Sequence, residues 1–240
     1  MKSAIDGYVH DVGERIAPTV AGRSRIEADV RTHLEESVAA GASEAEAIAR
    51  MGPPEDVARA YLEGVELVPA RRTRRLGAFL LDMGLGTTLI GSLVLLAVVA
   101  VNHGAGLENV PLPLGIALAV TAAAVSVAAL LYFPMMEALF GQTAGKRLFG
   151  IGVAREDGSR VGLGPALVRR IPLLFDFWPL DALFVFFTEK RQRAFDMVAR
   201  TVVIEGGREH RGAWAWTALA WAVTGLVALG LSLLHGEMHN

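Results

Sequence analysis

RLGAFLLD, at residues 75–82, determines the fold, because it sets an arginine and an aspartate at the start of a long apolar run. A spacing of seven residues is close to two helical turns, so Arg75 and Asp82 share one face of the predicted helix. Asp82 then lies roughly 10 Å deeper than Arg75, at about 1.5 Å of rise per residue. Since a charge inside hydrocarbon costs at least about 2.5 kcal/mol, we expect Asp82 to face the protein interior, in a functional role or paired with Arg75.

Three apolar runs predict an integral membrane protein. Residues 76–101 contain Asp82 as their only charge, and residues 112–133 and 213–234 contain none. Each run reaches the roughly 20 apolar residues that are needed to span a bilayer. Hydrophobic residues make up 52% of the chain, and its formal net charge of -2 gives no sign of a nucleic-acid partner. About three transmembrane helices in contact with membrane lipid are therefore expected.

Residues 1–64 are predicted to form a cytoplasmic domain of four short helices, because their apolar residues recur at helical spacing. The apolar faces of the first two helices are formed by Ile5, Val9, Val12 and Ile16, and by Ile26, Val30, Leu34 and Val38. Capping boxes, in which a serine and a glutamate bond each other's backbone, are predicted at Ser24 with Glu27 and at Ser43 with Glu46. A domain this small buries only a modest core. We therefore expect it to pack against a protein partner, a second copy of the chain in a homo-oligomer, or the membrane part.

Lysine and arginine in the short loops set the orientation. The basic linker at residues 65–75 and the basic connection after the second apolar run favour the cytoplasm, whereas the loop after Asn102 lacks basic residues and is placed outside. Residues 188–211 are basic as well, and only residues 171–187 separate the two basic regions. Because so short a segment does not cross a membrane twice, we predict a re-entrant or interfacial helix pair there; the alternative is a single crossing with an outside basic loop.

Two pieces of the inner loops alternate like strands. Residues 151–155 and 161–163 flank Asp157-Gly158, a hairpin turn signal, and residues 201–204 are predicted to add a third strand. The predicted fold class is an all-α membrane protein with about three transmembrane helices, a re-entrant or interfacial helix pair, a small cytoplasmic β-hairpin and an N-terminal four-helix soluble domain. Its predicted units are a helical domain at 1–64, a linker at 65–75, a membrane domain at 76–205 and a C-terminal transmembrane helix and tail at 206–240.

Five acidic residues form the candidate site for coupling a cation to a proton: Asp82, Glu137, Asp176, Asp181 and Asp196. A cation–proton exchanger needs a membrane carboxylate whose pKa is raised by burial, and carboxylate oxygens are hard ligands that suit small cations. Asp82 is the best candidate for that role. An equal alternative is structural: Arg75, Arg169 and Arg170 pair with the acids and hold the helices together.

Other chemistries are excluded by the residue types present. The chain contains no cysteine, which removes disulfides, zinc thiolates and thiol nucleophiles. The segment from Gly141 to Arg147 has three residues between its glycines where a phosphate-binding loop needs four, and arginine replaces the Ser or Thr of that loop. We therefore expect no enzyme activity, no cofactor and no dedicated metal site.

Residues 72–205 resemble the RDD family of bacterial membrane proteins, named for one arginine and two aspartates that match Arg75, Asp82 and Asp196. Further positions that match the family's pattern are Gly141, Gln142, Thr143, Gly145 and Lys146 of its glycine-lysine turn, Arg169 after the hairpin, and Asp176. Arg200 departs from the pattern, since the family usually has glycine before the Thr-Val-Val strand. The resemblance implies a multi-pass protein of the bacterial cytoplasmic (inner) membrane and, for some members, exchange of Na⁺, Li⁺ or K⁺ for H⁺.

Residues 4–63 resemble the helical signalling domain abbreviated HAAS, through His33-Leu34 and the segment at residues 47–54. That resemblance implies a bacterial regulator with a protein partner at its N-terminal domain. Two functions are thus expected: small-cation and proton transport first, and a regulatory or scaffolding membrane protein as the alternative.

Overall fold

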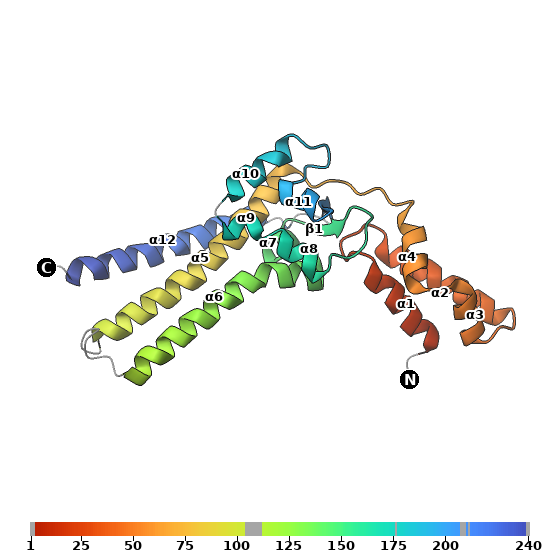
Figure 1. Cartoon of the computed structure of the whole chain (residues 1–240), viewed down its shortest axis with the longest axis horizontal. Coiled ribbons are helices and arrows are strands. Elements are labelled where there is room, and N and C mark those ends of the chain that lie inside the picture. The colour runs from red at the N-terminus through yellow and green to blue at the C-terminus, as the bar shows by residue number, and fades with distance from the viewer. Residues whose placement is uncertain (1–2, 104–111, 176, 207–209, 211, 239–240) are drawn as a thin grey trace.

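The structure is a computed structural model that describes residues 3–103, 112–175, 177–206, 210 and 212–238. Figure 1 shows the long helices extending to one side, the N-terminal helical domain at the opposite end, and a small sheet with short helices between them. The C-terminus lies at the far end of the long helices from the N-terminal domain.

Four helices form the N-terminal domain, as predicted: α1 (Ala4–Arg15), α2 (Arg23–Ala39), α3 (Glu44–Met51) and α4 (Pro54–Leu62). The capping box of Ser43 and Glu46 is confirmed, with the Glu46 N–H donating to Ser43 Oγ at 3.3 Å. The box predicted at Ser24 is wrong. Gly22, whose φ of 87° is in the left-handed region, starts α2 earlier, so Ser24 lies inside the helix and Glu27 accepts a hydrogen bond from Arg23 instead.

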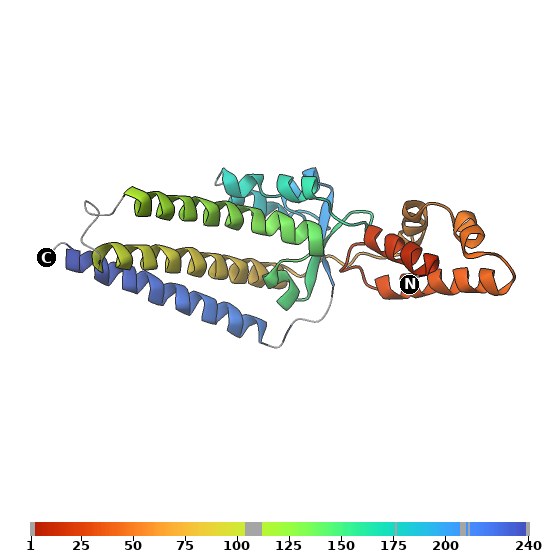
Figure 2. The same cartoon turned by 90° about the horizontal axis from the view of Figure 1, so that it is seen from below.

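The three long helices are α5 (Arg72–His103), α6 (Leu112–Phe140) and α12 (Ala213–Met238). Within the described residues, Arg72–Leu95 and Ala213–Gly230 are long and apolar enough to cross a membrane, and Leu130–Phe140 is a shorter apolar stretch. Helix α12 lies along α5 (Figure 2), where Thr88 and Thr224 share a hydrogen bond of 2.7 Å. Large apolar side chains remain exposed on these helices, as expected of a surface that faces lipid.

The sheet has two antiparallel strands, β1 (Ile151–Arg155) and β2 (Thr201–Glu205), with Val153 opposite Val203. Successive side chains of a strand point to opposite faces. On one face, Ala154, Val202 and Ile204 belong to the hydrophobic core of the N-terminal domain. On the other face, Ile151, Val153 and Val203 belong to a second core that reaches α5 and α12. The sheet is therefore buried between the two parts of the protein.

The predicted hairpin of residues 151–163 is wrong, because the partner of β1 is the segment predicted as a third strand. The turn itself forms, with Gly158 at a φ of 80° and the Arg155 N–H donating to Ser159 O at 3.0 Å. After the turn, the chain pairs with the end of α1: the Arg160 N–H donates to Arg15 O at 2.9 Å. It then enters helix α8 (Leu163–Val168) rather than a strand.

The remaining helices are short: α7 (Ala144–Leu148), α9 (Ile171–Leu174), α10 (Trp178–Leu183), the 3₁₀ helix η2 (Phe184–Phe186) and α11 (Ala194–Val198). At about 1.5 Å per residue, α10 covers roughly 9 Å, far less than a bilayer. Figure 1 places α9, α10 and α11 at the same end of the long helices. The described parts of this segment thus lie together at one end of the long helices.

Candidate functional site

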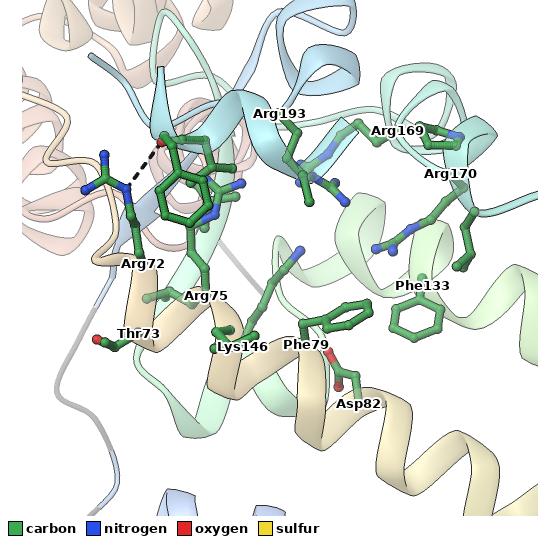
Figure 3. A pocket seen from close by; sticks show the side chains of 18 residues that line it. Arg72, Thr73, Arg75, Phe79, Asp82, Phe133, Lys146, Arg169, Arg170 and Arg193 are labelled. Carbon is green, nitrogen blue, oxygen red and sulfur yellow. Dashed lines mark hydrogen bonds between the residues drawn. The ribbon is translucent and has the colours of Figure 1, made fainter. Parts of the chain in front are cut away.

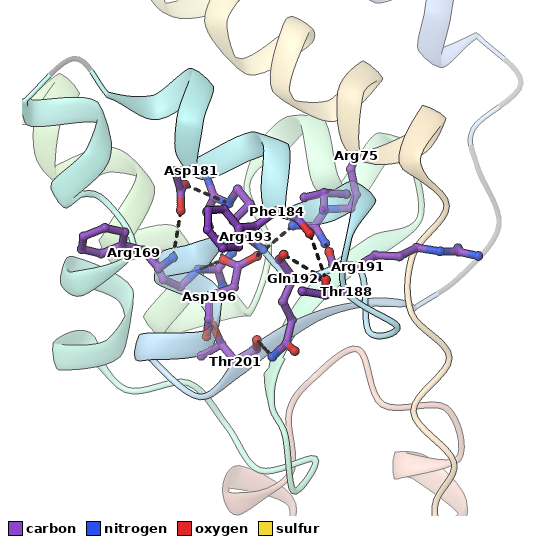
Figure 4. A network of polar contacts seen from close by, with 12 residues as sticks. Arg75, Arg169, Asp181, Phe184, Thr188, Arg191, Gln192, Arg193, Asp196 and Thr201 are labelled. Atoms are coloured by element: carbon purple, nitrogen blue, oxygen red, sulfur yellow. Dashed lines mark hydrogen bonds and ion pairs between the residues drawn. The ribbon is translucent and has the colours of Figure 1, made fainter.

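A cluster of buried charges joins α5 to α11, and its centre is the fully buried Asp196. Arg75 Nη2 donates to Asp196 Oδ2 at 2.8 Å, and Arg75 Nη1 donates to the carbonyl of Arg191. Arg193 donates to the same carboxylate twice, from its backbone N–H to Oδ2 at 3.1 Å and from Nη2 to Oδ1 at 3.2 Å. Figure 4 shows these side chains converging on Asp196.

Arg169 connects this carboxylate to a second one on α6. Its Nε lies 3.1 Å from Asp196 Oδ1, and its Nη1 lies 3.5 Å from Oε2 of Glu137. Glu137 is fully buried, and its Oε1 accepts hydrogen bonds from Lys146 Nζ and from Arg170 Nη2. Three basic side chains therefore contact one carboxylate, and the two ion-pair centres form one continuous network.

Burial and neighbouring charges shift the pKa values of Asp196 and Lys146, the two members of this network that lie on the short helices α11 and α7. Burial would raise the pKa of the Asp196 carboxyl, but the attraction of Arg169, Arg193 and Arg75 outweighs it and holds the pKa well below its usual range. Burial lowers the pKa of Lys146 to about 7, with Glu137 opposing the shift and repulsion from Arg169 and Arg170 adding to it. Lys146 thus loses its proton more easily than an exposed lysine does.

Asp82 has different partners from the one predicted. Thr143 Oγ1 donates to Asp82 Oδ2 at 2.5 Å, and the Gly145 N–H donates to Oδ1 at 2.8 Å. Seven-residue spacing does place Arg75 and Asp82 on one face of α5. However, α11 supplies the partner of Arg75, while the start of α7 supplies the donors to Asp82, so the two side chains serve separate contacts.

The glycine-lysine turn is explained by this contact. Thr143 caps α7, its Oγ1 accepting from the Lys146 N–H at 3.3 Å while it donates to Asp82. A Cβ on Gly145 would lie 2.3 Å from the carbonyl oxygen of Ala78, so only glycine lets α7 approach α5 this closely. Gly141 adopts a φ of 67°, and Gln142 Nε2 donates to Ile151 O at 2.9 Å, which joins the turn to β1.

Two predicted acids remain. Asp181 is buried, and its Oδ1 accepts from the Phe195 N–H at 2.8 Å while Oδ2 lies 3.7 Å from Arg193 Nε. It therefore positions α11 from α10. Asp176 lies outside the described residues.

Sequence reasoning missed Arg193 and Gln192. Arg193 stands three residues before Asp196, a spacing that brings side chains together at a helix start and that could have suggested the pair. Gln192 Nε2 donates to Glu156 Oε1 at 2.8 Å and to Thr201 O at 2.9 Å, and no local pattern predicts these contacts across the fold.

A cavity of about 350 Å³ lies beside the cluster, between the first turns of α5 and the segment from Arg169 to Phe186 (Figure 3). Asp82 is the one acidic residue in its described lining. Among the described residues, no group of three or more His, Cys, Asp or Glu side chains is arranged to hold a metal ion. The arrangement holds α5, α6, α7 and α11 together and presents basic groups to the cavity.

Two family models match the chain. The model of the RDD family matches residues 69–200, more than half of the chain, and the model described as HAAS matches residues 21–60. Neither the curated proteins nor the solved structures yield a match. Together with the two long apolar helices, the family match indicates a membrane protein. The chain therefore belongs to the RDD family, with a HAAS domain at its N-terminus.

Proposed function

We propose that the chain is a regulatory membrane protein, in which the N-terminal domain α1–α4 transmits a cytoplasmic binding event to the buried charge cluster. One observation carries this proposal: the β1–β2 sheet completes the core of the N-terminal domain with one face and the core beside the cluster with the other. A merely tethered domain would share no core with the membrane part.

The segment after α1 makes the contact. Ile16 and Ala17 are fully buried, and the Ala17 N–H donates to Gly158 O at 3.1 Å. Thr19 fills the space over two glycines, since a Cβ on Gly152 or Gly206 would lie 2.2 Å or 2.6 Å from it. Close packing of this kind transmits a displacement of one element to its neighbour, because close-packed interiors have few voids and low compressibility.

Arg160 provides a polar connection from α1 to the end of α6. Its Nη1 forms an ion pair with Glu14, its Nε donates to Ala138 O at 3.3 Å, and its Nη2 donates to Leu139 O. Glu137, the next residue back along α6, carries the three basic contacts of the cluster. A shift of α1 would therefore reach Glu137 through one side chain.

The orientation is part of the proposal. We place the N-terminal domain in the cytoplasm and count three crossings, by α5, α6 and α12. The arginines at residues 71–75 support this, because basic residues flanking a first span favour the cytoplasmic side.

A double-mutant cycle tests the coupling. Ala17→Arg places a charge in the buried contact between the segment after α1 and the turn at Gly158. Asp196→Asn removes the charge of the carboxylate at the centre of the cluster. If the sites are coupled, the two changes in unfolding free energy, measured on the full chain in detergent, fail to add by about 0.5–3 kcal/mol. Ala49→Arg on the exposed surface of α3 should add with Asp196→Asn to within about 0.5 kcal/mol. Additivity in the Ala17 cycle as well would refute the coupling.

Cation–proton exchange is the second candidate, and Asp82 is the observation that favours it. Among the described acids of the site, its carboxylate is held by neutral donors, Thr143 and Gly145, and it lines the cavity. Glu137 and Asp196 are less suited to bind a cation, because basic side chains already occupy them. The excess of basic groups around the cavity opposes the entry of Na⁺, Li⁺ or K⁺ and makes this the weaker candidate.

Liposomes containing the purified protein separate the two functions. The regulatory proposal predicts no proton flux in response to Na⁺, Li⁺ or K⁺ between about pH 6 and 9. A cation-dependent flux that is lost in Asp82→Asn, with the protein level unchanged, would establish exchange instead. Asn keeps the shape of the side chain and removes its charge, so loss of flux would assign the coupling to that carboxylate.

A further inference from the structure

The cavity beside the cluster is lined by two kinds of side chain. Its basic lining residues are Arg72, Arg75, Lys146, Arg169, Arg170 and Arg193. Its apolar lining residues include Leu76, Phe79, Phe133, Leu173, Val185 and Phe186. Figure 3 shows Lys146 and Arg170 reaching toward each other from opposite walls, next to the rings of Phe79 and Phe133.

The charges around the cavity do not balance. The six basic side chains of the lining face Asp82 and three carboxylates that contact them from behind the lining, Glu137, Asp181 and Asp196. With Lys146 protonated, this leaves two positive charges unmatched among the described side chains. Arg72 contributes one, since its described contacts are the carbonyl of Val185 at 3.4 Å and the ring of Phe186, whose centroid lies 5.3 Å from its Cζ.

A buried hydrogen-bond donor of Arg170 is also left over. Within the described structure, the buried Nε of Arg170 makes no hydrogen bond. The Nε and Nη1 of Arg169, by contrast, lie 3.1 Å from Asp196 Oδ1 and 3.5 Å from Glu137 Oε2. The Arg170 nitrogen is buried, so bulk water does not reach it freely. Buried donors of this kind are normally paired, and guanidinium groups suit phosphate oxygens.

The location favours a ligand that also has hydrocarbon. The cavity lining includes Leu76, on the first turns of the apolar helix α5, and Phe186. These side chains are 55% and 63% exposed, so the cavity reaches the surface beside them. The neighbouring Phe187 and Leu180 are 82% and 64% exposed, so the surface around the opening is apolar. An apolar surface at the end of a membrane helix lies at the level of lipid headgroups.

We propose that this cavity binds the phosphate group of an anionic phospholipid of the adjacent leaflet, with the acyl chains along α5 and η2. The leftover positive charge and the unpaired Nε of Arg170 receive the phosphate. The apolar lining accepts the start of the hydrocarbon. The site requires the protein to be in a membrane, but it does not require coupling to the N-terminal domain. The lipid proposal can therefore be tested independently of the proposed regulation.

Lipid binding to the purified full-length protein tests the proposal. Phosphatidylglycerol and phosphatidylcholine with the same acyl chains are titrated into detergent, and retained lipid is counted by native mass spectrometry. We expect phosphatidylglycerol to bind preferentially. Arg72→Gln should weaken it about tenfold, because one charge-assisted contact is lost. Arg71→Gln, the same charge change at an exposed neighbour outside the lining, should have little effect.

A variant that fills the cavity tests whether lipid retention depends on the cavity itself rather than on the positive charge alone. Leu173→Trp adds bulk to the lining without changing its charge and should reduce retention of phosphatidylglycerol. Inorganic phosphate distinguishes the two sources of the anion: binding of phosphate alone, with no preference between the two lipids, would overturn the lipid assignment. Equal losses in Arg71→Gln and Arg72→Gln would overturn the site.

Discussion

Gly145 is the residue that the contact between α5 and α7 constrains most. In Gly145→Ala the new Cβ would lie 2.3 Å from Ala78 O and 2.9 Å from Asp82 Oδ1, and the first of these atoms belongs to the backbone. The helices must separate, so we expect a loss of about 1–3 kcal/mol in unfolding free energy. Gly164→Ala is the matched control, because a Cβ added there would meet no atom within 4 Å. Equal melting temperatures of the two variants would contradict the close approach.

Lys146 makes stability depend on pH. Its pKa in the folded protein is about 7, below the ordinary value of 10.5, so between these values the unfolded chain binds more protons than the folded one. Stability from this group therefore rises as the pH rises through that range. Lys146→Met removes the titration, and the rise in melting temperature between about pH 6 and 9 should be smaller in the variant. Identical pH profiles would show that burial does not lower this pKa.

Arg200 shows how the chain departs from its family without losing the turn. Its φ of 50° lies in the left-handed region, where glycine is favoured, and its carbonyl still accepts from the Glu156 N–H at 3.2 Å. An L residue there costs roughly 1–2 kcal/mol, against about 0.5–1 kcal/mol of extra chain entropy for glycine. Arg200→Gly should thus raise the unfolding free energy by up to about 1 kcal/mol in a denaturant titration. A clear loss of stability would mean that the exposed side chain contributes more than the turn.

Sequence reasoning reached the charged residues but not their pairing. Helical spacing correctly puts Arg75 and Asp82 on one face of α5, because that relation is local. The partners Asp196 and Thr143 come from segments 121 and 61 residues away in the chain, and spacing along one helix contains no information about them. Gly145 was singled out as part of a motif, although its steric reason appears only when α7 lies against α5.

Among the elements, the sheet was predicted in part. The strand patterns of residues 151–155 and 201–204 were correct, but the hairpin rule paired β1 with the nearest apolar segment. That rule fails because Ser159 and Arg160 pair with the end of α1, an element from the other part of the protein. Non-local competition of this kind decides many strand pairings.

The segment α9–η2 gives a prediction about topology. Lys190, 55% exposed on its side chain, follows this segment, whereas Gln192 is 4% exposed and unsuitable for labelling. The chain has no cysteine, so Lys190→Cys provides a single reporter. If the segment is interfacial, an impermeant thiol reagent should label it after the cells are opened and not in intact cells, with Asn102→Cys showing the reverse. Labelling of position 190 from outside would establish a crossing instead.

For the molecule as a whole, the domain order follows from composition, since a polar helical segment precedes the apolar runs. The contact between the two parts does not follow from it. Ile16 was predicted to lie on the apolar face of the first helix, yet it belongs to one hydrophobic core with Ala154 and Val202 of the sheet. A small domain that needs more core obtains it here from the sheet of the membrane part.

Hydrogen exchange of the full-length protein directly probes the coupling between domain and cluster. Wild type and Ala17→Arg are compared in lipid nanodiscs by mass spectrometry, with Ala49→Arg as the exposed control on the same domain. We predict faster exchange in Ala17→Arg at residues 144–148 and 193–200, which carry Lys146, Arg193 and Asp196 of the charge cluster. Exchange near the substitution should be faster as well, because a loosened contact lowers the local opening free energy. Faster exchange confined to residues 4–62, with the cluster segments as protected as in wild type and in Ala49→Arg, would contradict the coupling.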